Sequence, residues 1–219
     1  MKNIIFIAPP AAGKGTQAKL VSNEYNIPHI STGDLLREEI NKNSTIGLSI
    51  KKDLENGSLV SDEVITTLLK NRITKSDCLN GYILDGYPRN LNQAKRYNDL
   101  LNELGFDKYI VIFFNIDKEV ALERTLSRIV CPNCGSSYNL KIENLKPHKE
   151  NICDRCNHQL QTRIDDTKDV FINRFDTYLN STKDLIEYYQ KLGFLYQIDV
   201  SNKNPDEIFG EVKEILNND

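Results

Sequence analysis

A short apolar run passes directly into a turn rich in glycine and lysine near the start of the chain. Residues 4–17 read IIFIAPPAAGKGTQ, in which the β-branched residues indicate a buried strand and the following glycines indicate the start of a helix. In such a turn backbone N–H groups face an anion, Lys14 reaches phosphate oxygens, and the Thr16 hydroxyl can ligate Mg²⁺. The usual pattern is G-x-x-x-x-G-K-[ST], but here Ala8 replaces the first glycine and Gly15 separates Lys14 from Thr16. The segment predicts a phosphate-binding loop of unusual sequence.

The rest of the chain alternates short apolar runs with longer helical patterns, which is typical of an α/β fold with a parallel sheet covered on both faces. The expected strands span residues 4–8, 28–31, 82–85, 109–115 and 194–199. The expected helices span residues 15–25, 34–41, 61–73, 91–104, 118–127, 167–192 and 205–216. Polar signatures follow the first three strands, in residues 8–16, 31–34 and 85–89. We expect these three loops to meet at one edge of the sheet, where ligands of such folds bind.

Length and charge exclude several classes of protein. The 219 residues suffice for one sizeable core and a small insert. The net charge of −3 gives no electrostatic footprint for DNA or RNA. No apolar run approaches the roughly 20 residues of a membrane-spanning helix, and the first run is shorter than the roughly 7–15 apolar residues of a signal peptide. We therefore expect a cytoplasmic protein without nucleic-acid or membrane partners.

Four of the five cysteines form two CxxC pairs in a turn-rich stretch, residues 130–163, that interrupts the alternation. The four are Cys131, Cys134, Cys153 and Cys156. Their spacing is typical of a tetrahedral Cys₄ ribbon that holds zinc, with iron as the alternative metal. Basic and acidic residues in the ribbon are nearly balanced, which favours a structural clip over a nucleic-acid surface. We expect His148 and His158 to be solvated and Cys78 to be a lone, partly buried thiol.

Together these motifs resemble one family closely, the adenylate kinases of the long type with a zinc-bearing lid. The resemblance covers essentially the whole chain and rests on residues 13–17 (GKGTQ), 29–37 (HISTGDLLR), 84–89 (LDGYPR) and 162–166 (TRIDD), with the CxxC pairs placed as in that family's lid. It implies reversible transfer of the γ-phosphoryl group of Mg-ATP to AMP, giving two ADP, for adenine nucleotide homeostasis.

The resemblance also implies a division of the chain and a monomeric state. A P-loop kinase core with a five-stranded parallel sheet would comprise residues 1–31, 74–127 and 164–219. A helical AMP-binding arm would comprise residues 32–73. A small zinc-ribbon lid would comprise residues 128–163 and close over ATP, which excludes water from the reaction.

The resemblance assigns roles to individual residues as well. Phosphoryl transfer requires positioning and charge stabilisation, and the rigid fork of arginine suits phosphate oxygens. The implied catalytic residues are Lys14, Asp85, Arg89, Arg128, Arg163 and Arg174. The implied ATP contacts are Ala11, Ala12, Gly13, Lys14, Gly15, Thr16, Arg124, Arg128, Ser137, Tyr138 and Lys203. The implied AMP contacts are Thr32, Arg37, Ser58, Leu59, Val60, Gly86, Tyr87, Pro88, Arg89, Gln93, Arg163 and Arg174.

Some of these roles have local alternatives. Asp85 would hold Mg²⁺ through water, although an aspartate after a strand can also cap a turn. Arg124 would stack on the ATP adenine, or else belong to a solvated helix face. Asp165 and Asp166 would pair with cations of the lid or core, with helix capping as an alternative for Asp166. The acceptor is already an ionised phosphate, so no histidine is assigned to catalysis and His29 is expected to be structural.

Three other functions stay open, and the phosphate loop departs from the family. The chain could use another nucleoside monophosphate, or it could be a degenerate nucleotide-binding switch or a ribbon-type nucleic-acid binder. The family usually has glycine at Ala8 and Ala11 and a small non-proline residue at Pro9. Alanine in the left-handed region costs roughly 1–2 kcal/mol, and proline lacks an N–H to donate. We expect a loop that is stiffer than usual but competent to bind phosphate.

Overall fold

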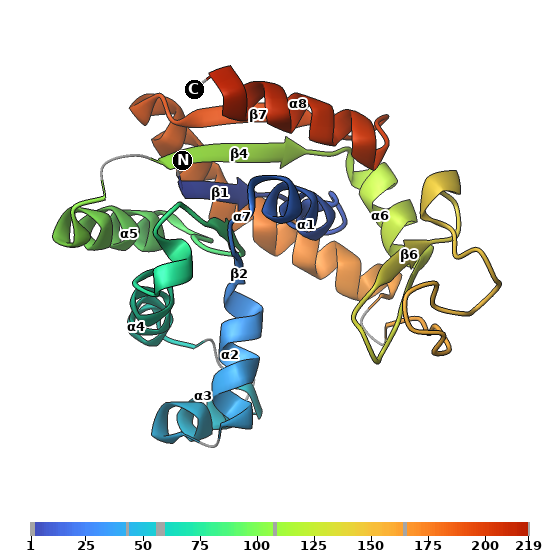
Figure 1. Ribbon diagram of the computed structural model, residues 1–219, viewed down its shortest axis with the longest axis horizontal. Coiled ribbons are helices and arrows are strands. Elements are labelled where there is room, and N and C mark those ends of the chain that lie inside the picture. Colours follow the sequence, from blue (N-terminus) through green and yellow to red (C-terminus); the bar gives the residue numbers. More distant parts are fainter. Residues whose placement is uncertain (1–2, 43, 56–59, 107–108, 164–165, 219) are drawn as a thin grey trace.

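A parallel sheet of five strands, in the order β2-β3-β1-β4-β7, forms the centre of the molecule (Figure 1). The computed structural model describes residues 3–42, 44–55, 60–106, 109–163 and 166–218. The strands are β1 (Asn3–Ile7), β2 (His29–Ser31), β3 (Ile83–Asp85), β4 (Tyr109–Asn115) and β7 (Leu195–Asp199). The predicted α/β fold and its five-stranded parallel sheet are confirmed, and each strand end lies within one residue of its expected place.

Helices connect these strands and extend beyond them at both ends of the molecule. Those packed around the sheet are α1 (Lys14–Tyr25), α5 (Leu91–Leu104), α6 (Lys118–Leu126), α7 (Lys168–Leu192) and α8 (Pro205–Asn218). A short 3₁₀ turn, η1 (Ser76–Cys78), precedes β3. All of the expected helices are present, with ends within two residues of the predicted ones. No helix among the described residues is both long and apolar enough to span a bilayer.

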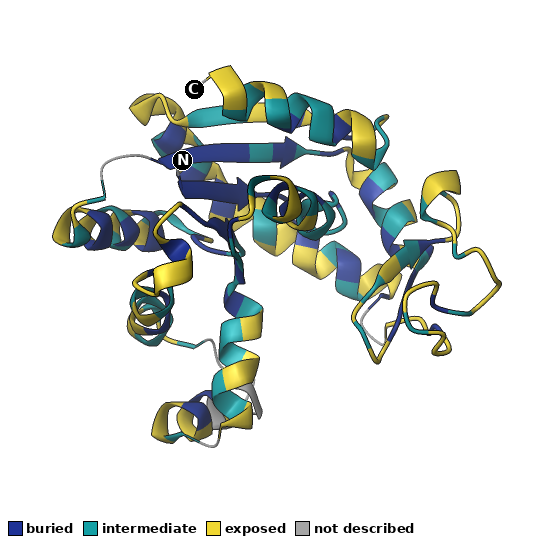
Figure 2. Ribbon diagram, in the orientation of Figure 1, coloured by how far each residue is buried: buried dark blue, intermediate teal, exposed yellow. Residues whose placement is uncertain are grey.

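The two faces of β1 bury separate apolar clusters, because successive side chains of a strand point to opposite sides. Ile4 and Phe6 pack with residues of α1, α8 and the first part of α7, whereas Ile5 and Ile7 pack with residues of α4, α5 and the last part of α7. Figure 2 shows β1 buried along its whole length and β4 buried over most of it. Full burial of each such side chain contributes about 1.5–3 kcal/mol, so this core fixes the strand ends from which the loops start.

An arm of helices projects from the sheet on one side (Figure 1). It consists of α2 (Thr32–Asn41), α3 (Thr45–Glu55) and α4 (Asp62–Ile73). Helix α3 was not predicted from the sequence, because Gly47 lies near its start and glycine lowers helix propensity. A Cβ on Gly47 would lie 2.0 Å from the carbonyl oxygen of Glu39, so the glycine is what allows α3 to pack closely on α2. Ser44 caps the new helix by accepting a 2.9 Å hydrogen bond from the Gly47 N–H.

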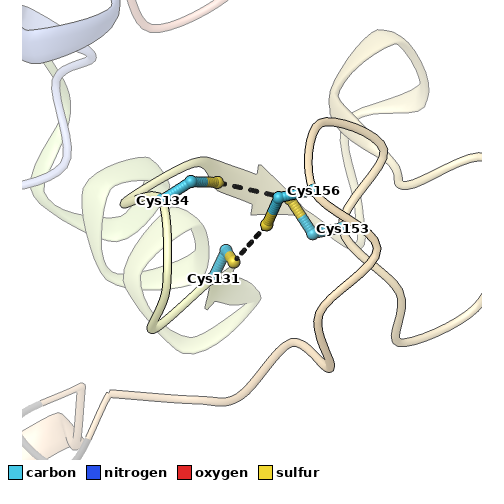
Figure 3. A group of neighbouring side chains, drawn as sticks. All are labelled: Cys131, Cys134, Cys153 and Cys156. Atoms are coloured by element: carbon cyan, nitrogen blue, oxygen red, sulfur yellow. Dashed lines mark hydrogen bonds between the residues drawn. The ribbon is translucent and has the colours of Figure 1, made fainter.

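The lid lies at the other side of the sheet and is built around a small antiparallel pair. Strands β5 (Arg128–Val130) and β6 (Ser137–Asn139) pair with Ile129 opposite Tyr138, and a 3₁₀ turn, η2 (Glu143–Leu145), follows. Its four cysteines converge on one point (Figure 3). Their Sγ atoms all lie within 4.8 Å of one another, which confirms that the two CxxC pairs form one cluster.

The turn between β1 and α1 carries backbone strain at one alanine. Ala11 has a φ of 63°, in the left-handed region, and Gly13 at the N-cap of α1 has a φ of 84°. Ala8 is not among the described residues with positive φ; it is 8% exposed and its methyl group packs in the core. The strain expected from the sequence is therefore present at Ala11 and absent at Ala8. At Ala8 the alanine that stands in place of glycine adds a buried methyl group to the core.

Restoring glycine at the two positions should have opposite effects on stability. Ala11→Gly removes left-handed strain of roughly 1–2 kcal/mol, which outweighs the roughly 0.5–1 kcal/mol that glycine adds to the entropy of the unfolded chain. Ala8→Gly has no strain to relieve, so the lost methyl contact and the added entropy should lower the free energy of unfolding by about 1 kcal/mol. Urea unfolding of both variants tests this, and a loss of stability in Ala11→Gly would contradict the assignment of strain.

Candidate functional site

A cleft of about 1200 Å³ lies at the carboxyl ends of the strands. Its walls come from the β1–α1 turn, the ends of β2 and β3, the lid, α7 and the segment between β7 and α8. The three polar loops predicted to meet at one edge of the sheet do so here. The volume exceeds the roughly 300–1,000 Å³ of an ordinary small-molecule site, so the cleft has room for more than one small ligand.

The charge of the cleft differs from that of the whole chain. The lining residues with basic side chains are Lys14, Lys19, Arg89, Arg124, Arg128, Arg155, Arg163, Arg174 and Lys203. Asp85 is the one acidic residue among the described residues that line the cleft. Because the chain as a whole has a net charge of −3, this concentration of cations is local. Such a surface attracts a ligand with several negative charges.

The start of α1 offers backbone donors to that ligand. Gly13 is the N-cap, and among the described residues no side chain caps this helix start. The first N–H groups of a helix have no partner within it, and they carry the positive end of the helix dipole. Ala12, Gly15 and Thr16 line the cleft beside them, as the phosphate-loop pattern predicts.

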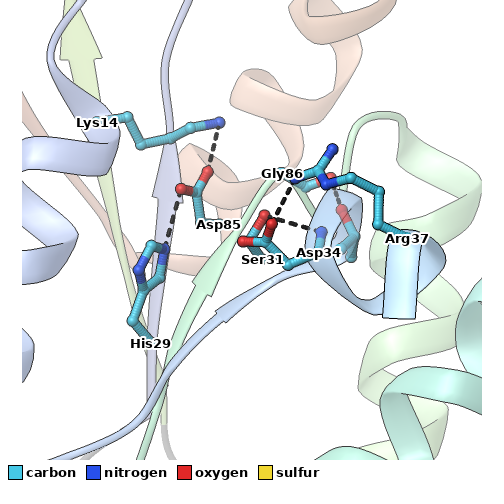
Figure 4. A network of polar contacts seen from close by, with 8 residues as sticks. Lys14, His29, Ser31, Asp34, Arg37, Asp85 and Gly86 are labelled. Carbon is cyan, nitrogen blue, oxygen red and sulfur yellow. Dashed lines mark hydrogen bonds and ion pairs between the residues drawn. The ribbon is translucent and has the colours of Figure 1, made fainter. Parts of the chain in front are cut away.

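Lys14 and His29 both contact the carboxylate of Asp85, at the end of β3 (Figure 4). Lys14 Nζ lies 3.0 Å from Asp85 Oδ1, and His29 Nε2 lies 3.0 Å from Asp85 Oδ2. Burial by itself raises the pKa of Asp85, but the hydrogen bond from His29 and the charge of Lys14 outweigh it and hold that pKa at about 2. Asp85 is therefore fully ionised at neutral pH. The ionised form is the one that can hold a hydrated divalent cation.

His29 has a contact that its expected structural role did not include. Ser31 on β2 is in register with Asp85 on β3, and His29 lies two residues before Ser31 on the same face of the strand. A carboxylate can only accept, so the Nε2 atom of His29 carries the hydrogen and orients Asp85. The sequence signal was a polar residue spaced by two from the strand end, next to a strand that ends in aspartate.

Arg128 is tied to Asp166 where the chain enters and leaves the lid. The guanidinium binds both carboxylate oxygens, with Arg128 Nε donating to Asp166 Oδ2 at 2.8 Å, and the Asp166 side chain is fully buried. Pairing with a cation of the lid or core was one of the two expectations for Asp166, and the structure confirms it. Loss of Arg128 would leave a buried carboxylate without its counter-charge, a change that is strongly destabilising. Asp165 lies outside the described residues.

Other arginines of the expected catalytic set face the same cleft. Arg89, Arg163 and Arg174 line it, and Arg89 Nε donates to the Gly86 carbonyl oxygen at 2.8 Å. Arg155 of the lid also lines the cleft, although no motif in the sequence pointed to it. It lies inside the second CxxC motif, so only the folding of the cysteine cluster brings it to this wall.

Arg124 binds backbone in this structure. Its Nη2 atom donates to the carbonyl oxygens of Val200 at 2.8 Å, Ser201 at 3.3 Å and Lys203 at 3.3 Å. Burial lowers the pKa of this guanidinium. The stacking of Arg124 on adenine stays a prediction, but its contact with the Lys203 carbonyl brings two of the expected ATP residues together.

The residues expected to contact AMP are hydrogen-bonded to one another. Thr32 Oγ1 donates to the Gly86 carbonyl oxygen at 3.0 Å, and Gln93 Oε1 accepts from the Arg89 N–H at 2.8 Å. Gln93 Nε2 also donates to Asp62 Oδ1 at 2.7 Å.

None of Thr32, Arg37 and Gln93 lines the cleft; Arg37 is exposed and pairs with Asp34. Tyr87 is buried and donates to the Gln93 carbonyl oxygen at 3.1 Å, while Val60 is half-buried. Ser58 and Leu59 lie outside the described residues.

The lid contributes Ser137 and Tyr138 to the cleft, as expected from the resemblance. The Tyr138 hydroxyl, however, is directed to the cysteine cluster, 3.4 Å from Cys153 Sγ, and accepts from the Asp154 N–H at 2.8 Å. The side chain of His148 is 91% exposed and His158 is exposed too, as expected for solvated histidines.

Cys78 is more buried than expected and lies apart from that cluster. It is 2% exposed, and Arg72 Nη1 donates to its Sγ at 3.0 Å. Burial raises the pKa of this thiol to about 11. Cys78 is therefore a structural thiol of the core.

Comparison with known proteins gives one family over most of the chain. The family model described as adenylate kinase matches residues 6–194. The chain is 41% identical over 213 residues to the adenylate kinase of Thermoanaerobacter sp. (strain X514), covering 97% of each. It is 40% identical over 216 residues to that of Clostridium perfringens (strain SM101 / Type A), covering 99% of each, and 39% identical over 214 residues to that of Clostridium tetani (strain Massachusetts / E88), covering 98% of each.

Proposed function

The chain belongs to the adenylate kinase family and, as a nucleoside monophosphate kinase, converts ATP and AMP into two ADP; we propose that Lys14, Asp85 and the arginines of the cleft carry out this transfer. The observation that carries the assignment is the contact between Lys14 and Asp85 at the rim of the sheet, beside the phosphate-binding turn. This contact supports the assignment, because it holds a cation and an ionised carboxylate beside the turn proposed to bind the phosphates of a nucleotide.

On the ATP side, the backbone from Ala11 to Thr16 holds the phosphates and Lys14 moves from Asp85 to their oxygens. The family generally uses Mg²⁺ with ATP. The residues present fit such an ion, because the Thr16 hydroxyl and the Asp85 carboxylate are hard oxygen donors and Asp85 is ionised. When bound, Mg²⁺ would neutralise phosphate charge. Arg124, Ser137, Tyr138 and the backbone at Lys203 contact the nucleoside.

On the AMP side, Arg89 and Arg37 bind the phosphate, and Thr32 and Gln93 select the base. The remaining proposed contacts are Ser58, Leu59, Val60, Gly86, Tyr87 and Pro88. Gln93 must exchange its hydrogen bond with Asp62 for one with adenine, a change that costs little net free energy because one hydrogen bond replaces another. The acceptor oxygen of AMP is already ionised, so the reaction needs no general base.

The molecule works as three parts: the core (residues 1–31, 74–127 and 164–219), the AMP arm (32–73) and the lid (128–163). Arg128, Arg163 and Arg174 surround the transferred phosphoryl group and stabilise the charge that spreads over its oxygens. Closing of the lid would bring these side chains together and exclude water, which would otherwise accept the phosphoryl group.

Zinc is the metal proposed for the four cysteines of the lid. Thiolates are soft ligands, and four of them within 4.8 Å match a closed tetrahedral shell that leaves no position for water. The cluster therefore stabilises the lid without taking part in the chemistry.

The enzyme is proposed to act as a cytoplasmic monomer. Disulfides are rare in a reducing compartment, and a chain whose cysteines gather in a metal-type cluster of four, with Cys78 apart from it, suits such a compartment.

The first test is the kinase assay with matched variants. Lys14→Ala and Arg89→Ala should each lower kcat by at least about 10²-fold, because each removes a cation that stabilises the transferred charge. Lys118→Ala and Arg96→Ala serve as controls, since these side chains form ion pairs on the surface away from the cleft. The rate of ADP formation from ATP and AMP is the measurement.

Two outcomes would contradict the assignment. Faster phosphorylation of CMP or UMP than of AMP would move the enzyme to another nucleoside monophosphate. Full activity in Lys14→Ala would show that the β1–α1 turn does not hold the reacting nucleotide.

The second test concerns the metal. One zinc ion should be found per chain by elemental analysis of protein purified without chelator. Replacing Cys131 and Cys134 by serine should remove it and lower the Tm, while substantial activity remains at low temperature, because the cluster does not contribute a reacting group. Cys78→Ser is the matched control and should keep the metal. Iron in place of zinc, or no metal at all, would refute the zinc assignment.

A further inference from the structure

The segment between β7 and α8 forms one wall of the cleft and is held by side chains of other elements. Lys203, Pro205 and Ile208 line the cleft. Arg124 of α6 donates hydrogen bonds to the carbonyl oxygens of Val200, Ser201 and Lys203. The position of this wall is therefore set from outside the segment.

Gln17 of α1 supplies a further attachment at the start of α8. Its Nε2 atom donates to the carbonyl oxygen of Pro205 at 2.8 Å, over 188 positions of the chain. Only the amide nitrogen can donate to a carbonyl, so this contact also fixes which way the amide points. Gln17 follows Thr16 directly, so one residue of α1 lies at the phosphate-binding turn and the next holds the opposite wall of the cleft.

Packing does not explain why this position holds an amide. Gln17 is 1% exposed, and its Oε1 atom is buried without a hydrogen-bond partner among the described residues. A buried acceptor that lacks a donor lowers the stability of the fold. Methionine has a similar length and would fill the same space without that unpaired oxygen. The amide is therefore better explained by the contact that its nitrogen makes.

The capping of α8 makes its first turn rigid, so the hydrogen bond from Gln17 to Pro205 positions the whole turn. Asn204 caps the helix by accepting from the N–H groups of Asp206 and Glu207, and Glu207 accepts in return from the Asn204 N–H at 2.7 Å. Pro205 is thus fixed within a rigid first turn. A hydrogen bond at its carbonyl sets the position of the whole turn relative to α1.

We infer that Gln17 is a positioning residue for the nucleoside of ATP: its amide sets the distance between the phosphate-binding turn and the wall at Lys203 and Pro205. The inference rests on the proposed ATP site. Gln17 touches neither a phosphate nor a reacting atom in this scheme. Its loss should weaken binding of the whole nucleotide and leave binding of the phosphates alone unchanged.

The experiment compares ATP with inorganic tripolyphosphate as calorimetric probes of the full-length enzyme. In Gln17→Met the Kd for ATP should rise about three- to tenfold, the loss expected for one hydrogen bond. The Kd for tripolyphosphate, the KM for AMP and kcat at saturating ATP should stay within about twofold of the unmutated enzyme. The free energy of unfolding should not fall, because the unpaired oxygen is removed together with the donor.

Two further variants keep the test decisive. Ser22→Ala is the matched control, since Ser22 also joins α1 to a backbone carbonyl, that of Ile27, but does not line the cleft; its Kd for ATP should be unchanged. Gln17→Leu removes both the donor and the unpaired oxygen with an apolar side chain of a different shape, so it should weaken ATP as Gln17→Met does.

Equal weakening of ATP and tripolyphosphate would overturn the inference, because Gln17 would then shape the phosphate turn. An unchanged Kd for ATP, or loss of the folded state in both Gln17 variants, would overturn it as well. Failure of the proposed function is a separate result: the unmutated protein would then bind neither ATP nor tripolyphosphate.

Discussion

The ionised carboxylate of Asp85 is the interaction around which the rest of the site is arranged. A carboxylate this close to a sheet core would bind a proton if it were left alone, because burial favours its neutral form. Lys14 and His29 prevent this from two sides. His29 lies on β2 and Lys14 at the start of α1, just after β1, and the sheet order places β2 and β1 on either side of β3. The parallel register of β1, β2 and β3 is therefore the structural condition for a charged site at the rim.

The walls of the cleft are held in different ways, which suits their different functions. At the base of the lid, Arg128 and the buried Asp166 form an ion pair that fixes where the lid begins and ends. Far along the lid, four thiols take the place of a hydrophobic core, which residues 128–163 are too few to build. The wall at Lys203 and Pro205 receives hydrogen bonds from the side chains of Arg124 and Gln17, so small changes there should alter affinity before they alter folding.

Much of this organisation was predictable, because it depends on local pattern. Apolar runs and capping residues located the five strands and all of the helices except α3, whose dependence on Gly47 arises from contact with α2. The CxxC spacing predicted the cysteine cluster. What the sequence could not predict were side-chain partners set by the tertiary fold: Arg155 in the cleft and Gln93 bound to Asp62. The sequence also could not predict that strain would occur at Ala11 and not at Ala8, since only the folded turn determines which φ is positive.

The pKa of Asp85 is the most direct measurement of this account. Carboxyl ¹³C NMR of aspartate-labelled protein, with the resonance assigned through Asp85→Asn, follows its ionisation as the pH is lowered. Because the folded-state pKa is about 2 and an unperturbed aspartate has a pKa of about 3.9, the resonance should not titrate between pH 7 and about pH 4, and the stability that the ion pairs provide should be lost only as the pH falls further. The pKa should rise in His29→Ala. A midpoint at about pH 4 or above in the unmutated protein would show that Lys14 and His29 do not hold the charge, and would contradict the account.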